Sequence, residues 1–270
     1  MQPDATNQAA AGPLVLTRVE GEIGTITLNH PEKRNSLSQP LVQGIIDALE
    51  GFAVDKLRAV ILRAPPGSRV WSAGHDVGEL PEGRRDPLGW DDPLRHLVRQ
   101  IESFPAPVIA MIEGSVWGGA SETVFACDLI VAEPGASFAV TPAKLGVPYN
   151  VSGMMTFLNA ANIRIVKELT FTAKPMSAER AERLGIINYV VPLGELEAFT
   201  YGLAADIATL APLSIAVMKE QLRILAGARP MSPQGFERVQ GLRRVVYDSE
   251  DYREGIRSFK EKRRAVFKGV

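Results

Sequence analysis

Two loops of small residues are the parts of this sequence best suited to binding a developing negative charge. The first covers residues 71–77, with the sequence WSAGHDV, shortly after an apolar run predicted to form a buried strand. The small side chains at 72–74 let backbone N–H groups approach a ligand closely. Taken alone, this pattern is more typical of an ordinary turn than of a ligand site.

The second loop covers residues 113–122, with the sequence EGSVWGGASE, and it follows another apolar run and opens a predicted helix. Free N–H groups at a helix start, together with the helix dipole, favour negative charge. A tight strand-to-helix turn would also explain these residues. The glycine spacing is not that of a dinucleotide-binding fingerprint, and no phosphate-loop Gly-Lys-Ser/Thr is present, so nucleotide hydrolysis and hydride transfer are not supported.

Elements that alternate between strand and helix surround the two loops. The apolar patterns predict a strand pair around the turn at 20–22 and further strands over 59–62, 108–112, 129–132 and 187–191. One helix is predicted after Ser38 and another after Asp91 or Asp92, because these residue types cap helices and apolar residues at helical spacing follow them. A short helix is predicted around 119–126. We therefore expect an α/β fold.

The C-terminal part of the chain has a different pattern. Amphipathic helices are predicted over about 194–209, 212–227, 232–247 and 250–264. We place a core at 13–200 and a C-terminal helical region, suited to packing on a neighbour, at 201–270. Residues 1–12 lack the basic start and apolar centre of a signal peptide and are predicted to be a disordered leader.

Composition excludes several classes of function. The chain has 30 basic and 31 acidic side chains, so its net charge of −1 gives no field that attracts nucleic acid. Three scattered histidines and one cysteine lack metal-ligand spacing, and a single cysteine fits a reducing compartment. No run approaches the ~20 apolar residues of a membrane span. We expect a cytoplasmic protein that binds no metal, nucleic acid or membrane.

The two loops together resemble the crotonase (enoyl-CoA hydratase/isomerase) superfamily. The matching patterns are Ala-Gly-X-Asp at 73–76 and Glu-Gly-X-X-X-Gly-Gly-X-X-Glu at 113–122, followed by Cys127-Asp128. Weaker matches occur at 29–37, 181–187 and 259–263, so the resemblance spans about 13–268. It implies a spiral of repeated β-β-α units with a C-terminal helical trimerisation region. It also implies a homotrimer or a dimer of trimers.

The resemblance implies an acyl-CoA thioester as substrate. On this chain the family's oxyanion hole corresponds to the backbone N–H groups of His75 and Gly119, which would stabilise a thioester enolate. Lys262 resembles the family lysine that meets a CoA phosphate, within one subunit or across a subunit contact, although a solvated helix lysine is equally expected there. The remaining residues implied to contact substrate are Ala73, Gly74, Asp76, Val77 and Thr141.

The chain departs from the hydratase pattern at two places. Glu122 matches the first of the two glutamates that hydratases use, but Pro142 stands where the second is expected. Residues 146–150, GVPYN, replace the usual Pro-Gly-X-Gly-Gly run and introduce Tyr149. Together these features resemble the superfamily members that decarboxylate methylmalonyl-CoA to propionyl-CoA. A second glutamate would repel the carboxylate of such a substrate at close range.

The resemblance leads to specific hypotheses about mechanism. We expect Tyr149 to orient the substrate carboxylate, and the His75 side chain or a water molecule to handle the proton. Glu122 would be a retained family residue with a structural role. The thioester carbonyl accepts the electron pair, so no cofactor is expected beyond the CoA of the substrate.

Two alternatives remain open at the level of sequence. The first is an enoyl-CoA hydratase or isomerase that works with Glu122 alone. The second is a non-catalytic homologue that binds CoA or RNA. Malonyl, methylmalonyl and ethylmalonyl substrates differ by single carbons, each worth about 1–3 kcal/mol in a pocket, and the sequence does not distinguish them.

Overall fold

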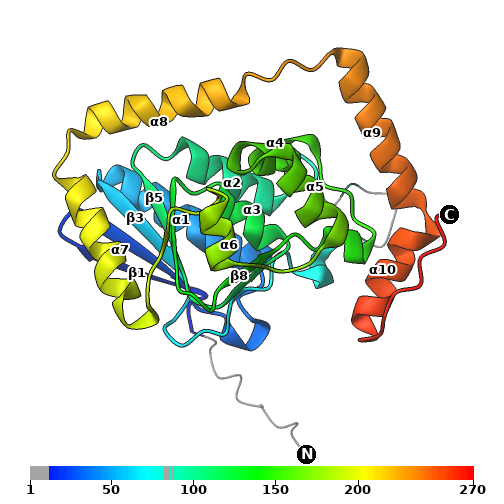
Figure 1. Ribbon diagram of the computed structural model, residues 1–270, viewed down its shortest axis with the longest axis horizontal. Helices are drawn as coiled ribbons and strands as arrows, with labels where there is room; N and C mark the ends of the chain where they lie inside the picture. The colour runs from blue at the N-terminus through cyan, green and yellow to red at the C-terminus, as the bar shows by residue number, and fades with distance from the viewer. Residues whose placement is uncertain (1–11, 82–85, 87) are drawn as a thin grey trace, which may run out of the picture.

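A computed structural model describes residues 12–81, 86 and 88–270 (Figure 1). The disordered leader predicted at 1–12 therefore lies, apart from Gly12, outside the described residues.

The larger of two sheets contains the strands that the apolar patterns predicted. Its order is β1-β2-β3-β5-β7-β10, and every neighbouring pair is parallel except β1 and β2. The last strand is shorter than the predicted 187–191. The bounds are β1 Val15–Glu20, β2 Ile23–Leu28, β3 Ala59–Arg63, β5 Val108–Ile112, β7 Leu129–Ala132 and β10 Tyr189–Val190.

The smaller sheet consists of very short strands, in the order β4-β6-β8-β9. Strands β4 (Val70–Ser72), β6 (Ser115–Trp117) and β8 (Ser137–Ala139) are parallel, and β9 (Met176–Ser177) is antiparallel to β8. Along the chain, β3 is followed by β4, β5 by β6 and β7 by β8, and a helix follows each pair. Each turn thus adds a strand to each sheet, which confirms the predicted spiral of β-β-α units.

The helices begin close to the predicted residues. Asp92 caps α2 by accepting from the N–H groups of Leu94 and Arg95. Ser38 precedes α1 as predicted, but its side chain makes no capping bond; the carboxylate of Glu79 accepts from Gln39 N instead. The bounds are α1 Gln39–Val54, α2 Pro93–Ser103, α3 Gly119–Phe125, α4 Val151–Ala160, α5 Ile163–Thr172, α6 Ala178–Arg183, α7 Leu193–Ala208, α8 Pro212–Gly227, α9 Pro233–Asp248 and α10 Glu250–Lys260.

The larger sheet buries both of its faces, because alternate residues of a strand point to opposite sides. Ala59 and Ile61 of β3 cluster with Leu196 and Ala204 of α7. Their neighbours in β3, Val60 and Leu62, belong to the main core with α1 and α2. Residue 200, the predicted boundary, lies inside α7, a helix that packs on the larger sheet.

Helix α8 contains no buried residue although it is largely apolar. Leu213, Leu222 and Leu225 are 81%, 68% and 71% exposed. Figure 1 shows α8 as a long helix along one side of the molecule, from which α9 and α10 continue to the C-terminus. Within the described residues no single helix is long and apolar enough to cross a membrane; α7 and α8 meet that criterion only as a pair bent by 105°.

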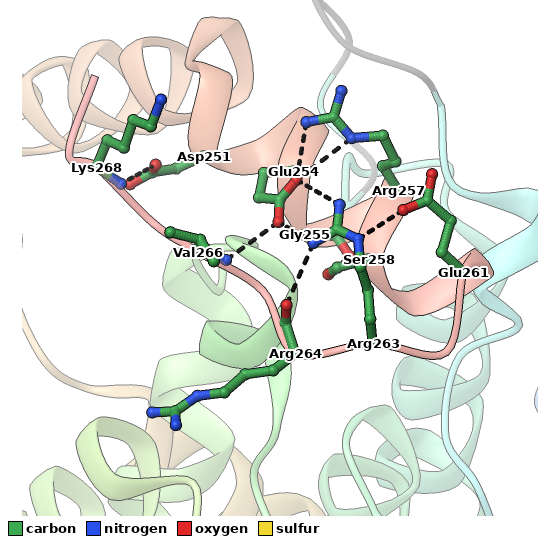
Figure 2. Close-up of polar contacts among 10 residues, drawn as sticks. All are labelled: Asp251, Glu254, Gly255, Arg257, Ser258, Glu261, Arg263, Arg264, Val266 and Lys268. Carbon is green, nitrogen blue, oxygen red and sulfur yellow. Dashed lines mark hydrogen bonds and ion pairs between the residues drawn. The ribbon is translucent and has the colours of Figure 1, made fainter.

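The C-terminal residues fold back along α10 (Figure 2). Glu254 accepts hydrogen bonds from Arg257, Arg263 and the backbone N–H of Val266, a group that we call the Glu254 cluster. Further along, the backbone N–H groups of residues 268 and 269 donate to Asp251. These bonds fasten the end of the chain to α10.

Helix α10 packs on the core of its own chain as well. A side chain at Gly255 would place its Cβ 2.2 Å from the carbonyl oxygen of Leu145, so only glycine permits this approach. Leu145 ends a 3-10 helix, η3 (Pro142–Leu145), which follows Thr141. The C-terminal region thereby supports one of the predicted site segments.

Candidate active site

The spiral brings three predicted site segments together. Residues 73–77 follow β4, Gly118-Gly119 follows β6, and Thr141 comes shortly after β8. Because β4, β6 and β8 are parallel neighbours, their carboxyl ends meet at one edge of the small sheet. The contacts are close: a Cβ at Gly118 would lie 3.0 Å from the Oγ1 of Thr141.

The amide groups of His75 and Gly119 lie side by side. A Cβ at Gly119 would be 3.4 Å from His75 N, and one at Gly74 would be 3.0 Å from Gly119 N. Gly74 has a φ of +86° and passes so near Trp117 O that a Cβ would lie 2.4 Å from it. Among the hydrogen bonds between described residues, neither amide is a donor. Both N–H groups are therefore available to one ligand oxygen.

A cavity of about 580 Å³ opens at these amides. Three predicted site residues, Gly74, Glu122 and Lys262, are not on its wall. Gly74 faces the backbone of Trp117 and Gly119. Lys262 follows α10 with a left-handed φ of 53°. The predicted residues that do line the cavity are Ala73, His75, Asp76, Val77, Gly119, Thr141 and Tyr149.

The imidazole of His75 is held by two acceptors. Its Nδ1 lies 3.1 Å from the backbone oxygen of Asp76, and its Nε2 lies 3.2 Å from Oδ2 of Asp92. Burial is the largest single influence and lowers the pKa of His75. The hydrogen bond and charge of Asp92, the backbone oxygen of Asp76 and the charge of Glu79 together outweigh burial, so the pKa is raised overall. The ring is thus directed to groups of its own chain.

Tyr149 combines a packed ring with an unpartnered hydroxyl. Its ring meets Phe157 edge-on, with centroids 5.1 Å apart. Its Oη is buried and has no hydrogen-bond partner within the described part of the chain. Burial, and then the charge of Glu122, raise the pKa of Tyr149 well above its usual value, so the hydroxyl keeps its proton and is free to donate it in a hydrogen bond.

Glu122 lies behind the cavity wall, fully buried in α3. Its Oε1 accepts from Nη1 of Arg95, which is itself buried, while its Oε2 has no partner in the described part of the chain. Burial raises the pKa of Glu122 to about 7 in spite of Arg95. A side chain at Gly153 would place its Cβ 3.0 Å from Oε1 of Glu122 and 2.8 Å from Cδ1 of Tyr149. Glycine at 153 therefore allows both side chains to occupy this space.

The sequence patterns missed the site role of the first turn of α2. Asp92 was predicted only as a helix cap, yet it also holds His75, and Arg95 pairs with Glu122. Leu94 meets Gly119, since a Cβ there would lie 2.6 Å from Cδ2 of Leu94. Spacing along a helix carries no signal for contacts of this kind, because they depend on how α2 packs against α3.

Cations also line the cavity. Lys33, Arg34 and Lys144 are part of its wall, and Lys33 lies 3.4 Å from the carboxylate of Asp76. No group of three or more His, Cys, Asp or Glu side chains that could hold a metal ion is found in residues 12–81, 86 and 88–270. The arrangement can bind an anionic ligand and stabilise an oxyanion.

Known proteins share this fold and much of this sequence. The enoyl-CoA hydratase/isomerase family matches residues 18–270. Methylmalonyl-CoA decarboxylase of Escherichia coli (strain K12) is 50% identical over 248 residues, which cover 92% of this chain and 95% of that protein.

Two solved structures of methylmalonyl-CoA decarboxylase are also similar. The complex with 2-nitronate-propionyl-CoA has a TM-score of 0.94 and 49% identity, and the match covers 95% of this chain and 99% of that chain. The complex with 2S-carboxypropyl CoA also has a TM-score of 0.94 and 49% identity, and the match covers 95% and 98%. The family match covers most of the chain, so this protein belongs to the enoyl-CoA hydratase/isomerase family, the crotonase superfamily that its two loops resemble.

Proposed function

We propose that this protein decarboxylates methylmalonyl-CoA to propionyl-CoA. The proposal rests on the absence of a free carboxylate pair beside the two oxyanion amides in the part of the chain that the structure describes. Pro142 lies there instead of a second glutamate, and Glu122 is withdrawn into an ion pair with Arg95. The 50% identity with a methylmalonyl-CoA decarboxylase supports the same activity.

The reaction follows from charge and geometry. The bond between the carboxylate carbon and the α-carbon breaks, CO2 leaves, and the electron pair moves to the thioester oxygen. The N–H groups of His75 and Gly119 would stabilise the resulting enolate, and one such donor is typically worth about 2.7–4 kcal/mol of barrier. A proton then adds to the α-carbon and gives propionyl-CoA. The thioester is the electron sink, so the step draws on no further cofactor.

Tyr149 is the group that we assign to the substrate carboxylate. Its protonated hydroxyl is the one unpartnered buried side-chain polar atom on the described cavity wall. A hydrogen bond from it would fix the carboxylate. Because both ring nitrogens of His75 have acceptors, the proton for the enolate comes from water in this proposal.

The rest of the substrate would lie along the cationic part of the wall. Lys33, Arg34 and Lys144, which line the cavity, would meet CoA phosphates in this proposal. Ala73, Asp76 and Val77 would contact the thioester arm. The sequence-based assignment of Lys262 to a CoA phosphate is retained, with a neighbouring subunit as the place where it could act.

We also propose that the chain forms a homotrimer or a dimer of trimers. The exposed apolar side chains of α8 support this, because a monomer rarely leaves a helix of that kind uncovered. A cytoplasmic location, without nucleic-acid or membrane partners, is proposed from the composition.

Hydration or isomerisation by Glu122 alone is the alternative within the family. A hydratase uses paired acid–base groups to place water and move a proton. The ion pair with Arg95 and the proline at 142 both oppose this reading. A non-catalytic homologue that binds CoA or RNA is opposed by the two free amides and by the net charge of −1.

Mass spectrometry of purified protein incubated with methylmalonyl-CoA tests the proposal, with crotonyl-CoA as a parallel substrate. Formation of propionyl-CoA without added cofactor is expected, with little change in crotonyl-CoA. Addition of water to crotonyl-CoA, with methylmalonyl-CoA untouched, would support the hydratase alternative instead.

A further inference from the structure

The first turn of α2 contacts three parts of the candidate site within four residues. Asp92 meets the imidazole of His75, Leu94 meets Gly119, and Arg95 meets Glu122. The Oδ1 of Asp92 accepts from two backbone N–H groups of α2, so its position is fixed by the helix itself. Its other oxygen, Oδ2, is the one that faces His75.

Both ring nitrogens of His75 face groups that only accept hydrogen bonds. The backbone oxygen of Asp76 has no proton to give to Nδ1, and an ionised Asp92 has none to give to Nε2. Both contacts are hydrogen bonds only when each nitrogen carries a proton. That form of the ring is the imidazolium ion.

The surrounding charges favour the same form. Asp92, the N-cap of α2, and Glu79 of the 3-10 helix Val77–Glu79 are acidic groups that act on the ring. Asp76, beside it, is offset by Lys33 from the segment before α1. The imidazole side chain is 16% exposed and that of Asp92 is 8% exposed, so little solvent weakens their attraction.

We propose that Asp92 is a positioning residue that holds His75 as a fixed cation beside the two oxyanion amides. This inference rests on the proposed decarboxylation and deepens it. The cation stabilises the negative charge that moves from the carboxylate to the thioester oxygen. The ring is an electrostatic element of the site and does not deliver the proton to the α-carbon.

Nuclear magnetic resonance of the imidazole ring nitrogens measures directly whether His75 is a cation. The chain has only three histidines, and a His96→Gln variant removes one of the other two signals. In the wild-type protein at pH 7 we expect both nitrogens of His75 to carry protons. A neutral His75 ring at pH 7 would overturn the inference whatever the enzyme catalyses.

The variant Asp92→Asn tests the positioning role. Asparagine retains the capping ability of aspartate, so α2 is expected to remain folded. We expect the His75 titration to move down by roughly 1 pH unit or more. We also expect kcat to fall by about 10-fold or more while KM changes little, with the pH–rate profile shifted accordingly. Asp91→Asn, at the exposed neighbouring carboxylate, is the matched control and should leave both quantities unchanged.

A double-variant cycle separates this inference from the proposed function. Since Asp92 acts through His75, Asp92→Asn should lower kcat little further in a His75→Gln background. If Asp92→Asn lowered kcat by the same factor in the wild-type and His75→Gln backgrounds, the positioning role would be overturned. The wild-type protein could release no CO2 while both nitrogens of His75 carry protons and Asp92→Asn lowers the His75 titration. In that case the proposed function fails, and the inference that Asp92 holds His75 as a cation is retained.

Discussion

Two buried glutamates of this chain contact arginine side chains, and their carboxyl groups respond in opposite ways. Glu122 has one arginine partner and an unpartnered Oε2, and burial raises its pKa to about 7. Glu254 accepts from two arginines and a backbone N–H, and these hydrogen bonds hold its pKa well below its usual range. Glu122 lies deep in the fold, whereas Glu254 lies near the surface beneath its arginine partners, so the depth of burial and the number of donors together decide whether the ionised form is stabilised.

The same contrast separates the two regions that contain these residues. In the Glu254 cluster the carboxylate meets donors on both of its oxygens, and the cluster ties the chain end to α10 (Figure 2). Around the cavity, the Oη of Tyr149 and the Oε2 of Glu122 are left without partners in the described chain. An unpartnered buried polar group costs about 1–3 kcal/mol, so we expect substitutions here to change activity more than stability.

Gly119→Ala is expected to have the largest effect. Its methyl group would lie 3.4 Å from His75 N and 2.6 Å from Leu94, in the space that an oxyanion would occupy. We expect kcat for decarboxylation to fall roughly 10²–10³-fold. The melting temperature should also fall, by less than the loss of activity suggests, because the buried side chain of Leu94 must move aside. Gly241→Ala, in α9 with no atom within 4 Å of the added Cβ, is the control for a glycine-to-alanine change. More than half of wild-type activity in Gly119→Ala would remove the oxyanion assignment.

The pH dependence of stability should show the raised pKa of Glu122. The fold favours the protonated carboxyl, so this contribution is complete below pH 4.5 and is lost as pH rises through about 7. Urea unfolding should show a loss of about 3 kcal/mol from this group over that window. The pKa of His75 is also raised, so its contribution to stability is likewise lost as pH rises, at the upper end of this range. If the unfolding free energy of Glu122→Gln changed with pH as it does in the wild type, the assignment would be contradicted. The control Glu254→Gln should keep the wild-type pH dependence in this window.

Tyr149→Phe should separate activity from stability. Loss of a hydrogen bond to the substrate carboxylate should lower kcat by roughly 10–100-fold. Stability should stay the same or rise, since the hydroxyl has no partner in the unliganded chain. Tyr247→Phe is the matched control, because its hydroxyl bonds to Pro148 O and Arg243. Tyr247→Phe should lose stability and change kcat less than Tyr149→Phe does. Equal kcat values in Tyr149→Phe and the wild type would exclude the orienting role of Tyr149.

Glu254→Gln is expected to have the smallest effect on activity. The lowered pKa of Glu254 stabilises the fold above its ordinary pKa of 4.5, and this stability is lost as pH falls below that value. At neutral pH the variant should melt at a lower temperature and exchange the amide hydrogens of residues 268 and 269 faster. Its kcat should match wild type. A stability difference that persists undiminished at pH 3 would contradict the ionic origin of this cluster.

The sequence predicted the long elements well and the short ones poorly. Strands β3, β5 and β7 are continuous apolar runs, and α7 to α10 have helical spacing, so local patterns suffice for them. Strands β4, β6 and β8 have three residues each, too few for a periodic signal. Yet these short strands are the ones that bring the site loops together.

The sequence predicted the part of the site that consists of backbone groups. It did not predict the side-chain contacts that depend on how the elements pack. The paired amides follow from small residues in two loops, and the structure places them side by side. The contacts of Asp92 with His75 and of Arg95 with Glu122 join residues 17 and 27 positions apart. Only the packing of α2 against the loops decides such pairs, and a sequence pattern does not record it.

The most direct test of the account is decarboxylation in D2O of methylmalonyl-CoA labelled with ¹³C in its free carboxylate. The account predicts one labelled CO2 released for each propionyl-CoA formed, with one deuterium at the α-carbon of the product, because the amide-stabilised enolate takes its proton from water. Unchanged methylmalonyl-CoA in the presence of folded protein that hydrates crotonyl-CoA would contradict it.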